Sequence, residues 1–401
     1  MTVPAPTRLL NPALALYLAG LSGTALADAI LTVALPFVVL AAGGTAAGLG
    51  LVALCASLPR FAALLLGALA DRLPLRPLVV TAAVLRTLLV LGVGGYALSG
   101  GSQVGVFAVF ALLNGTLVAL TLTSGYVVVP RLVAEAQRPQ GNSLVSGTSQ
   151  GVQLLGYGLG GLLVHWIGGG PTLLLAAPLY LLLALVAALL SAYQESPTAA
   201  RHLPLLRDLA DGWQLVRRQR LLLFNLGLTF LLNLTLNVLN VRGPLFAQTV
   251  GRGALDYAWL EGLFSGGVLL GILAVWLLRR STVRVQFLVA LVVSTLGLLG
   301  HGVAQLPAWF AASAVTGLGI GLLDVTSMTQ LQQLVPDGLR GRVTGLSMSL
   351  AACGLSLGAL VGGARWATPS LMVGLGVVLA LYAAGYVPVS RPQRVAVRER
   401  G

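Results

Sequence analysis

The chain of 401 residues is 57% hydrophobic and only 9% charged, and its mean hydropathy is +0.92. A soluble fold is excluded, because soluble domains carry roughly 25% charged residues and one core cannot bury so much apolar surface. The net charge of +13 comes entirely from arginine. Nucleic-acid binding is excluded too, since the arginines lie in short gaps between apolar runs and form no basic stripe on a polar domain. The composition therefore indicates an integral membrane protein.

About twelve apolar runs are long enough to cross a membrane. A helix needs about 20 apolar residues to span a hydrocarbon core of ~30 Å, and it closes its backbone hydrogen bonds internally. The 51 glycines favour close helix packing. The sequence predicts an all-α integral membrane fold with twelve transmembrane helices. We expect these near 12–41, 46–69, 77–98, 103–128, 143–168, 171–193, 221–248, 256–278, 284–304, 307–333, 342–366 and 370–388.

The distribution of arginine predicts the orientation. The termini and the even-numbered loops hold 19 of the 24 arginines, the odd-numbered loops hold Arg242, Arg252 and Arg365, and Arg60 and Arg86 fall within spans. By the positive-inside rule, both termini are cytoplasmic. The abundance of Ala, Leu, Gly and Arg indicates a GC-rich bacterial genome. We therefore expect a multi-pass protein of the bacterial inner membrane.

An alternative for the N-terminus is a cleaved signal peptide, which Arg8, a short apolar stretch and the sequence Ala25-Leu26-Ala27 imitate. The apolar run continues through Ala41, and cleavage would leave an odd number of spans. We therefore expect the first helix to be retained.

The polar stretch 194–220 divides the chain near its midpoint, so we expect two six-helix bundles, 1–193 and 221–401, joined by a cytoplasmic linker. Apolar residues in the linker recur at roughly helical spacing opposite charged positions. This pattern predicts an amphipathic helix on the membrane surface, with a solvated loop as the alternative. The apolar positions are Leu203, Leu206, Leu209, Trp213 and Val216.

An internal repeat indicates that the two halves arose by duplication. The loop after the fourth span reads LVAEAQRPQGNSL and the loop after the tenth reads LVPDGLRGRVTGL, 202 residues further on. Each has an acid followed three residues later by an arginine, Glu135 and Arg138 in the first and Asp337 and Arg340 in the second. A match at half the chain length, in the equivalent loop, favours pseudo-symmetric halves.

Two carboxyls lie near the centres of predicted spans, Asp28 in the first and Asp324 in the tenth. An ionisable group at this depth is a candidate functional residue, because burial costs several kcal/mol unless the group is paired or faces water. Burial disfavours the charged form, so such a carboxyl can take up and release a proton. The alternative is a carboxylate locked to an arginine or to backbone donors.

The seventh span carries a polar stripe with helical spacing, Thr229, Asn233, Asn237 and Asn240, and Asn114 adds an amide in the fourth span. A lipid-facing stripe is excluded by its cost, so it faces a neighbouring helix or an aqueous cavity. The buried polar positions fall in helices 1, 4, 7 and 10. This placement favours a substrate cavity lined by these four helices.

Three further charged positions have less specific patterns. Arg60 and Arg86 enter their spans from the cytoplasmic side, and we expect them to reach toward that side in a structural role. Glu261, near the outer end of the eighth span, is expected to be solvated.

No pattern of an enzyme is present. His165, His202 and His301 are far apart and have no cysteine or carboxylate at ligand spacing. Cys55 and Cys353 lie in apolar runs of different halves, so we expect them to pack as small apolar groups. No phosphate-binding loop of the Walker type occurs, which excludes ATP-driven transport within this chain. We expect no cofactor and no metal.

The sequence GALADRLPLR, between the second and third spans, resembles the signature loop of the major facilitator superfamily, with matches at Gly67, Asp71, Arg72 and Arg76. Pro74 stands where a glycine is common. Three further segments are similar to the branch that contains macrolide-efflux-type drug exporters and enterobactin-exporter-like proteins. They are LADAILTVALPFVV in the first span, LLRDLADGWQLVRRQRLLL in the linker and LQQLVPDGLRGRVTGL after the tenth span.

The resemblance implies the major facilitator fold and proton-coupled export of hydrophobic or amphipathic small molecules by alternating access. It also implies that Asp71 and Arg72 gate the cytoplasmic side and that Asp28 lies in a central cavity lined by helices 1, 4, 7 and 10. The expected partners are a small-molecule substrate, protons and membrane lipid, with the protein acting as a monomer.

Two alternatives stay open. The same fold can export an endogenous metabolite, siderophore or lysolipid, and an anionic cargo would need Arg60 or Arg86 to face the cavity. A protein of a different class, a non-transporting membrane sensor or scaffold, would move no substrate and would tolerate Asp28→Leu.

Overall fold

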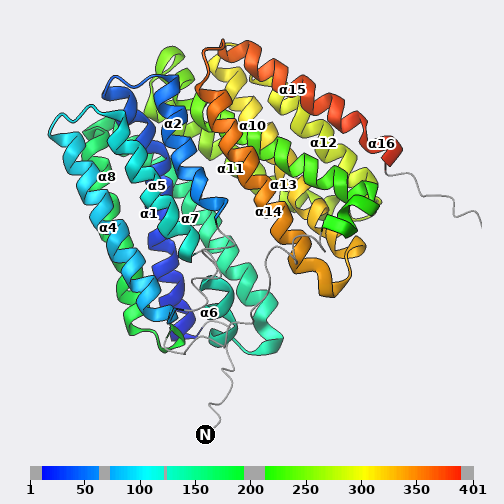
Figure 1. Ribbon diagram of the computed structural model, residues 1–401, viewed down its shortest axis with the longest axis horizontal. Helices are drawn as coiled ribbons and strands as arrows, with labels where there is room; N and C mark the ends of the chain where they lie inside the picture. Colours follow the sequence, from blue (N-terminus) through cyan, green and yellow to red (C-terminus); the bar gives the residue numbers. More distant parts are fainter. Residues whose placement is uncertain (1–10, 63–72, 122–123, 194–212, 390–401) are drawn as a thin grey trace, which may run out of the picture.

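The computed structural model describes residues 11–62, 73–121, 124–193 and 213–389, and every regular element in these ranges is a helix (Figure 1). The first half contains α1 (Pro12–Ala41), α2 (Ala46–Ser57), η1 (Leu58–Arg60), α4 (Leu75–Leu98), α5 (Val104–Thr121), α6 (Ser124–Leu132), η2 (Glu135–Gln137), α7 (Arg138–Ile167), α8 (Gly169–Leu189) and η3 (Ser191–Tyr193). The second contains α10 (Arg220–Val250), α11 (Ala254–Leu277), α12 (Val283–Gly300), α13 (Leu306–Leu334), α14 (Asp337–Gly363), α15 (Thr368–Ala384) and α16 (Tyr386–Val389).

Local sequence sets the boundaries of several helices. Asn11 caps α1, since its side-chain oxygen accepts a hydrogen bond from the Leu14 amide at 2.8 Å. Pro59 is the second residue of η1, the tighter turn into which the chain passes after α2 ends at Ser57. Gly168, with a φ of 82°, makes the sharp connection between α7 and α8.

Each of the twelve predicted spans contains a helix. Within the described ranges, nine helices are long and apolar enough to cross a membrane. The remaining three spans correspond to α2, which has 12 residues before η1, to α7, whose first half is rich in Gly, Ser and Gln, and to α15, which has 17 residues. The fourth predicted span comprises α5 and α6. The expected all-α membrane fold is therefore confirmed.

The helices form two bundles, which lie side by side in Figure 1 with α1 to α8 on the left and α10 to α16 on the right. In the first bundle, α8 packs against α1 and α4, α1 packs against α7, and α5 packs against α2. In the second, α13 packs between α11 and α12, and α10 packs against α14. This division agrees with the pseudo-symmetric halves inferred from the repeat.

The two bundles meet through α7 with α11 and through α2 with α14. These contacts gather at the end of the molecule where α7 and α14 finish and α2 and α11 begin. A Cβ on Gly161 would meet the Ala254 carbonyl oxygen at 2.9 Å, and one on Gly50 would meet the Ala359 carbonyl oxygen at 2.7 Å. Glycine at both positions allows backbones of opposite bundles to touch. The bundles are thus joined at the end away from the start of α1.

Several predictions fall outside the described residues. They concern the loop positions Gly67, Asp71 and Arg72 and most of the expected amphipathic helix, residues 194–212. Its final part is described, and residues 213–218 are helical. There Val216 is fully buried against Leu222 and Val343 of the second bundle. The linker boundaries stay a prediction.

Candidate functional site

A cavity of about 410 Å³ lies between the two bundles. Its wall is mostly apolar, with polar groups at a few points, as is usual for small-molecule sites. Residues from both bundles contribute. They are Asp28, Leu31, Thr32, Leu35, Pro36, Leu49, Val52, Ala53, Ala56, Ser57, Arg60, Phe110, Ala111, Asn114, Gly115, Val118 and Gln153 of the first, and Asn237, Asn240, Val241, Tyr257 and Leu355 of the second.

Asp28 lines this cavity and is the acidic member of a polar network. The Arg86 guanidinium forms an ion pair with its carboxylate, and the Tyr180 hydroxyl donates a hydrogen bond to the same carboxylate oxygen at 2.6 Å. Arg86 Nε donates to the Asn114 side-chain oxygen at 2.9 Å. Four helices, α1, α4, α5 and α8, therefore meet at one charged group.

The two charges of this pair lie in different environments. The Arg86 side chain is 4% exposed, whereas that of Asp28 is 36% exposed. Arg86 also lies over the Tyr180 ring, with 4.1 Å between the guanidinium carbon and the ring centroid. The buried cation is thus held by several groups, and the carboxylate is the member that faces the cavity.

The expectation that Arg86 reaches toward the cytoplasmic side was wrong, and its structural role stays a prediction. It does not extend toward the cytoplasmic end but is buried, because Asp28, Asn114 and Tyr180 supply acceptors and a ring face at its own depth. Tyr180 was not predicted from the sequence. Its only signal is a hydroxyl in an otherwise aliphatic run, and such a tyrosine is equally typical of a packed core.

The polar stripe of α10 divides into two parts. Asn237 and Asn240 line the cavity, and Asn237 also donates to the Leu355 carbonyl of α14. Thr229 and Asn233 are not among the lining residues; their side chains donate to the carbonyls of Asn225 and Thr229 in the same helix.

The other predicted positions are dispersed. Arg60 is exposed and lines the cavity, and Arg76 is half-buried in the first turn of α4. Asp324 is exposed but does not line the cavity, and α13 contributes no residue to its wall. The expectation that helix 10 lines this cavity is therefore not met. The reason is that α13 packs its small residues, such as Gly317 and Gly321, against α11.

Glu261 corrects another expectation. It is only partly exposed and lines a second, smaller pocket inside the second bundle. Its position near the end of the eighth predicted span indicated a solvated side chain, because the sequence does not reveal the aromatic side chains that cover it. Among the described residues, no three His, Cys, Asp or Glu side chains gather as metal ligands.

Comparison with known proteins agrees with this architecture. A family model described as Major Facilitator Superfamily matches residues 17–359. The multidrug efflux pumps Tap of Mycobacterium tuberculosis and Mycobacterium bovis are each 29% identical over 376 residues, which cover 88% of this chain and 86% of that protein.

Solved structures of the nucleoside transporter NupG share the fold at 14% sequence identity. One form superposes with a TM-score of 0.71 over 95% of this chain and 99% of that chain. A substituted form superposes with a TM-score of 0.76 over 95% of this chain and 100% of that chain. Because the family model covers most of the sequence, the chain is a transporter, not an enzyme, and it belongs to the major facilitator superfamily.

Proposed function

We propose that the protein exports hydrophobic or amphipathic small molecules across the bacterial inner membrane in exchange for protons. Its partners are the substrate, protons and lipid, and it acts as a monomer with both termini in the cytoplasm. The mostly apolar cavity and the relatives named as multidrug efflux pumps support this cargo. The observation that carries the proposal is the cavity-facing carboxylate of Asp28, paired with a buried arginine.

Protonation of Asp28 supplies the coupling step. A proton on the carboxylate removes its negative charge and weakens its attraction for Arg86, since the pair is held by Coulomb energy in a low-dielectric region. The Arg86 guanidinium is then held mainly by its contacts with Asn114 and the Tyr180 ring. The contacts among α1, α4, α5 and α8 therefore change. Because α1 also contacts α10 and α11 of the other bundle, this change reaches the bundle interface.

The contacts between bundles support an alternating-access cycle. If both termini are cytoplasmic, the closed end is the outer end, and the molecule is closed to the outside. In the opposite state the outer contacts separate, and Asp71, Arg72 and Arg76 latch the cytoplasmic side. We assign the primary coupling role to Asp28 rather than to Asp324, since only Asp28 lines the cavity.

The direct test measures accumulation of a panel of lipophilic dyes and drugs in inverted membrane vesicles under a pH gradient. Native protein should accumulate cargo, and a protonophore should abolish the accumulation. Asp28→Asn combined with Arg86→Gln should not accumulate cargo, and the double change avoids leaving a buried unpaired arginine. Equal accumulation by both proteins would make Asp28 structural, and no accumulation by native protein would refute the multidrug cargo.

A second cargo class is favoured by one observation, the position of Arg60 in the cavity wall. Arg86 is neutralised by Asp28, whereas no described residue forms an ion pair with Arg60. An endogenous metabolite with an anionic group would find its counter-charge there. Anionic and cationic dyes of the same scaffold distinguish the classes. Arg60→Gln should weaken transport of the anionic dye selectively and Arg60→Lys should retain it; equal effects on both dyes would reject this candidate.

A further inference from the structure

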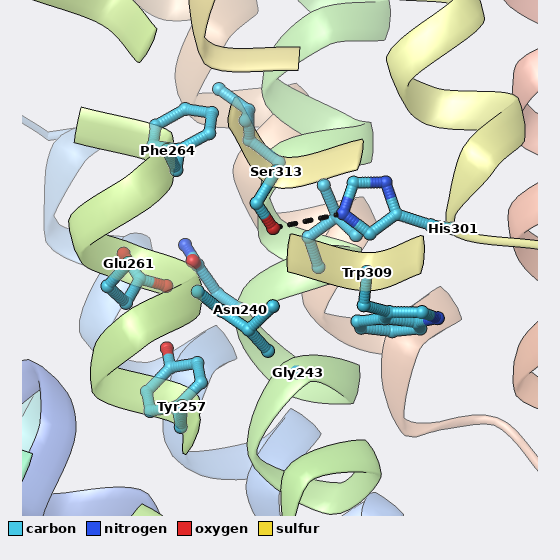
Figure 2. A pocket seen from close by; sticks show the side chains of 11 residues that line it. Asn240, Gly243, Tyr257, Glu261, Phe264, His301, Trp309 and Ser313 are labelled. Atoms are coloured by element: carbon cyan, nitrogen blue, oxygen red, sulfur yellow. Dashed lines mark hydrogen bonds between the residues drawn. The ribbon is translucent and has the colours of Figure 1, made fainter. Parts of the chain in front are cut away.

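The second bundle holds a small pocket of about 50 Å³ that the Asp28 network does not include (Figure 2). It is formed by α10, α11 and α13 together with His301 at the end of α12. Since one water molecule occupies roughly 30 Å³ of liquid, the pocket has room for water beside its polar groups. Its lining residues with polar side chains are Asn240, Tyr257, Glu261, His301, Trp309 and Ser313.

Glu261 is the acidic group of this pocket. The Tyr257 hydroxyl interacts with its carboxyl group, and Figure 2 shows the Asn240 side chain on the neighbouring helix beside them. Within the described part of the chain, no arginine forms an ion pair with Glu261. A carboxylate in such surroundings costs several kcal/mol if it stays charged without a cation. Glu261 is thus a carboxyl group with hydroxyl and amide neighbours and, among the described residues, no arginine partner.

The opposite wall of the pocket supplies no positive charge either. His301 Nδ1 is 3.0 Å from the Gly297 carbonyl oxygen, so this nitrogen carries a hydrogen and donates. Nε2 is 3.3 Å from the Ser313 hydroxyl, which donates to this nitrogen when the ring is neutral. The imidazole is 2% exposed and packs edge-on against Trp309. A neutral histidine fits these contacts.

The pocket adjoins the large cavity and the bundle interface. Asn240 and Tyr257 line both the pocket and the cavity. Tyr157 of α7, in the other bundle, interacts electrostatically with both Glu261 and Asp28. The titratable groups around Glu261 are thus Tyr257 on its own helix, Tyr157 on α7 and His301, while α10 and α13 contribute only neutral groups to the pocket.

We propose that Glu261 is a second proton-carrying group of this transporter. In the present state its carboxyl holds a proton. In the opposite state, separation of α7 and α11 opens the pocket to the outside, and the carboxylate takes a proton from a hydronium ion there. Back in the present state, the proton passes from the carboxyl oxygen to water in the adjoining cavity, on the cytoplasmic side, and leaves a carboxylate. Each cycle therefore forms and breaks one O–H bond and carries one proton inward. This inference rests on the proposed proton-coupled transport and places one carrier in each bundle.

The test uses purified full-length protein in proteoliposomes with the dye that native protein transports best. Glu261→Gln keeps the shape of the protonated acid but cannot release a proton. It should lose accumulation driven by a pH gradient while retaining dye exchange at equal concentrations, which needs no net proton movement. Glu261→Asp is the matched control and should retain gradient-driven accumulation. Unchanged accumulation by Glu261→Gln would overturn the proposal, and loss of both activities would show a structural role instead.

A second measurement does not depend on transport. Infrared difference spectra of native protein and Glu261→Gln at neutral pH should differ by the carbonyl stretch of one protonated carboxyl group. If native protein moves no dye under a pH gradient, the proposed function fails, yet this band still decides whether Glu261 holds a proton. Absence of the band from native protein would overturn the proposal.

Discussion

The two bundles each hold a carboxyl in polar surroundings, but they stabilise it differently. Asp28 of the first bundle is paired with Arg86 and accepts from Tyr180, whereas Glu261 of the second has tyrosine and amide neighbours and, among the described residues, no cation. In the proposed mechanism, a proton arriving at Asp28 competes with Arg86 and changes the contacts of four helices, whereas a proton at Glu261 displaces no ion pair. The first site would then move helices, and the second would store a proton.

Removing Arg86, the cation of the first site, should have the largest effect on the free energy of unfolding. Arg86→Leu leaves Asp28 without its partner, and breaking a buried ion pair costs about 3–5 kcal/mol. We expect a value near the lower end of this range, because the Asp28 side chain is 36% exposed. Thermal unfolding of the purified protein in detergent should show a clearly lower midpoint. Adding Asp28→Asn to Arg86→Leu should recover part of the loss, and no recovery would show that packing, not charge, explains it.

Removing the Tyr180 hydroxyl, which donates to the Asp28 carboxylate, should have a smaller effect on the free energy of unfolding. Tyr180→Phe keeps the ring under Arg86 but deletes the donor to Asp28, and a hydrogen bond to a charged group is worth about 1.5–3 kcal/mol. The same unfolding measurement should report this loss. In the Asp28→Asn background, Tyr180→Phe should cost less. An equal cost in both backgrounds would mean that the hydroxyl does not act through the carboxylate.

The corresponding change in the second bundle should have the smallest effect on stability. If Glu261 is protonated as proposed, Glu261→Gln replaces its carboxyl by an amide of the same shape, so at most one neutral hydrogen bond, ~1 kcal/mol, is altered. The unfolding midpoint of this variant should stay close to that of native protein. A destabilisation as large as that of Arg86→Leu would contradict the comparison, because it would indicate a charged, paired glutamate.

Much of the fold could be predicted from the sequence, because hydropathy determines where helices cross and helical spacing determines which side chains share a face. The polar stripe on α10 shows what helical spacing cannot predict. Its spacing placed Thr229, Asn233, Asn237 and Asn240 together, yet only the last two line the cavity. Spacing cannot show where a neighbouring helix covers a face and where it does not.

The ion pair of Asp28 and Arg86 could not be predicted either, because the partners are far apart in the sequence. Asp28 could be identified alone, since a carboxyl in mid-span is costly without a role. Its partners Arg86 and Tyr180 are 58 and 152 residues away. Pairing across helices depends on the packing of α1, α4 and α8, which no local pattern specifies. Glu261 was misjudged for a related reason, because its pocket is closed by residues of α10, α12 and α13 as well as by its own helix.

The most direct test of proton-driven alternating access is the distance between spin labels at both ends of the bundles. Labels at exposed Arg138 and Arg280 report one end, and labels at exposed Ser102 and Gln305 report the other. Lowering the pH should change the two distances in opposite directions, and Asp28→Asn with Arg86→Gln should reduce this response. Two distances that stay constant, or that change in the same direction, would contradict the account.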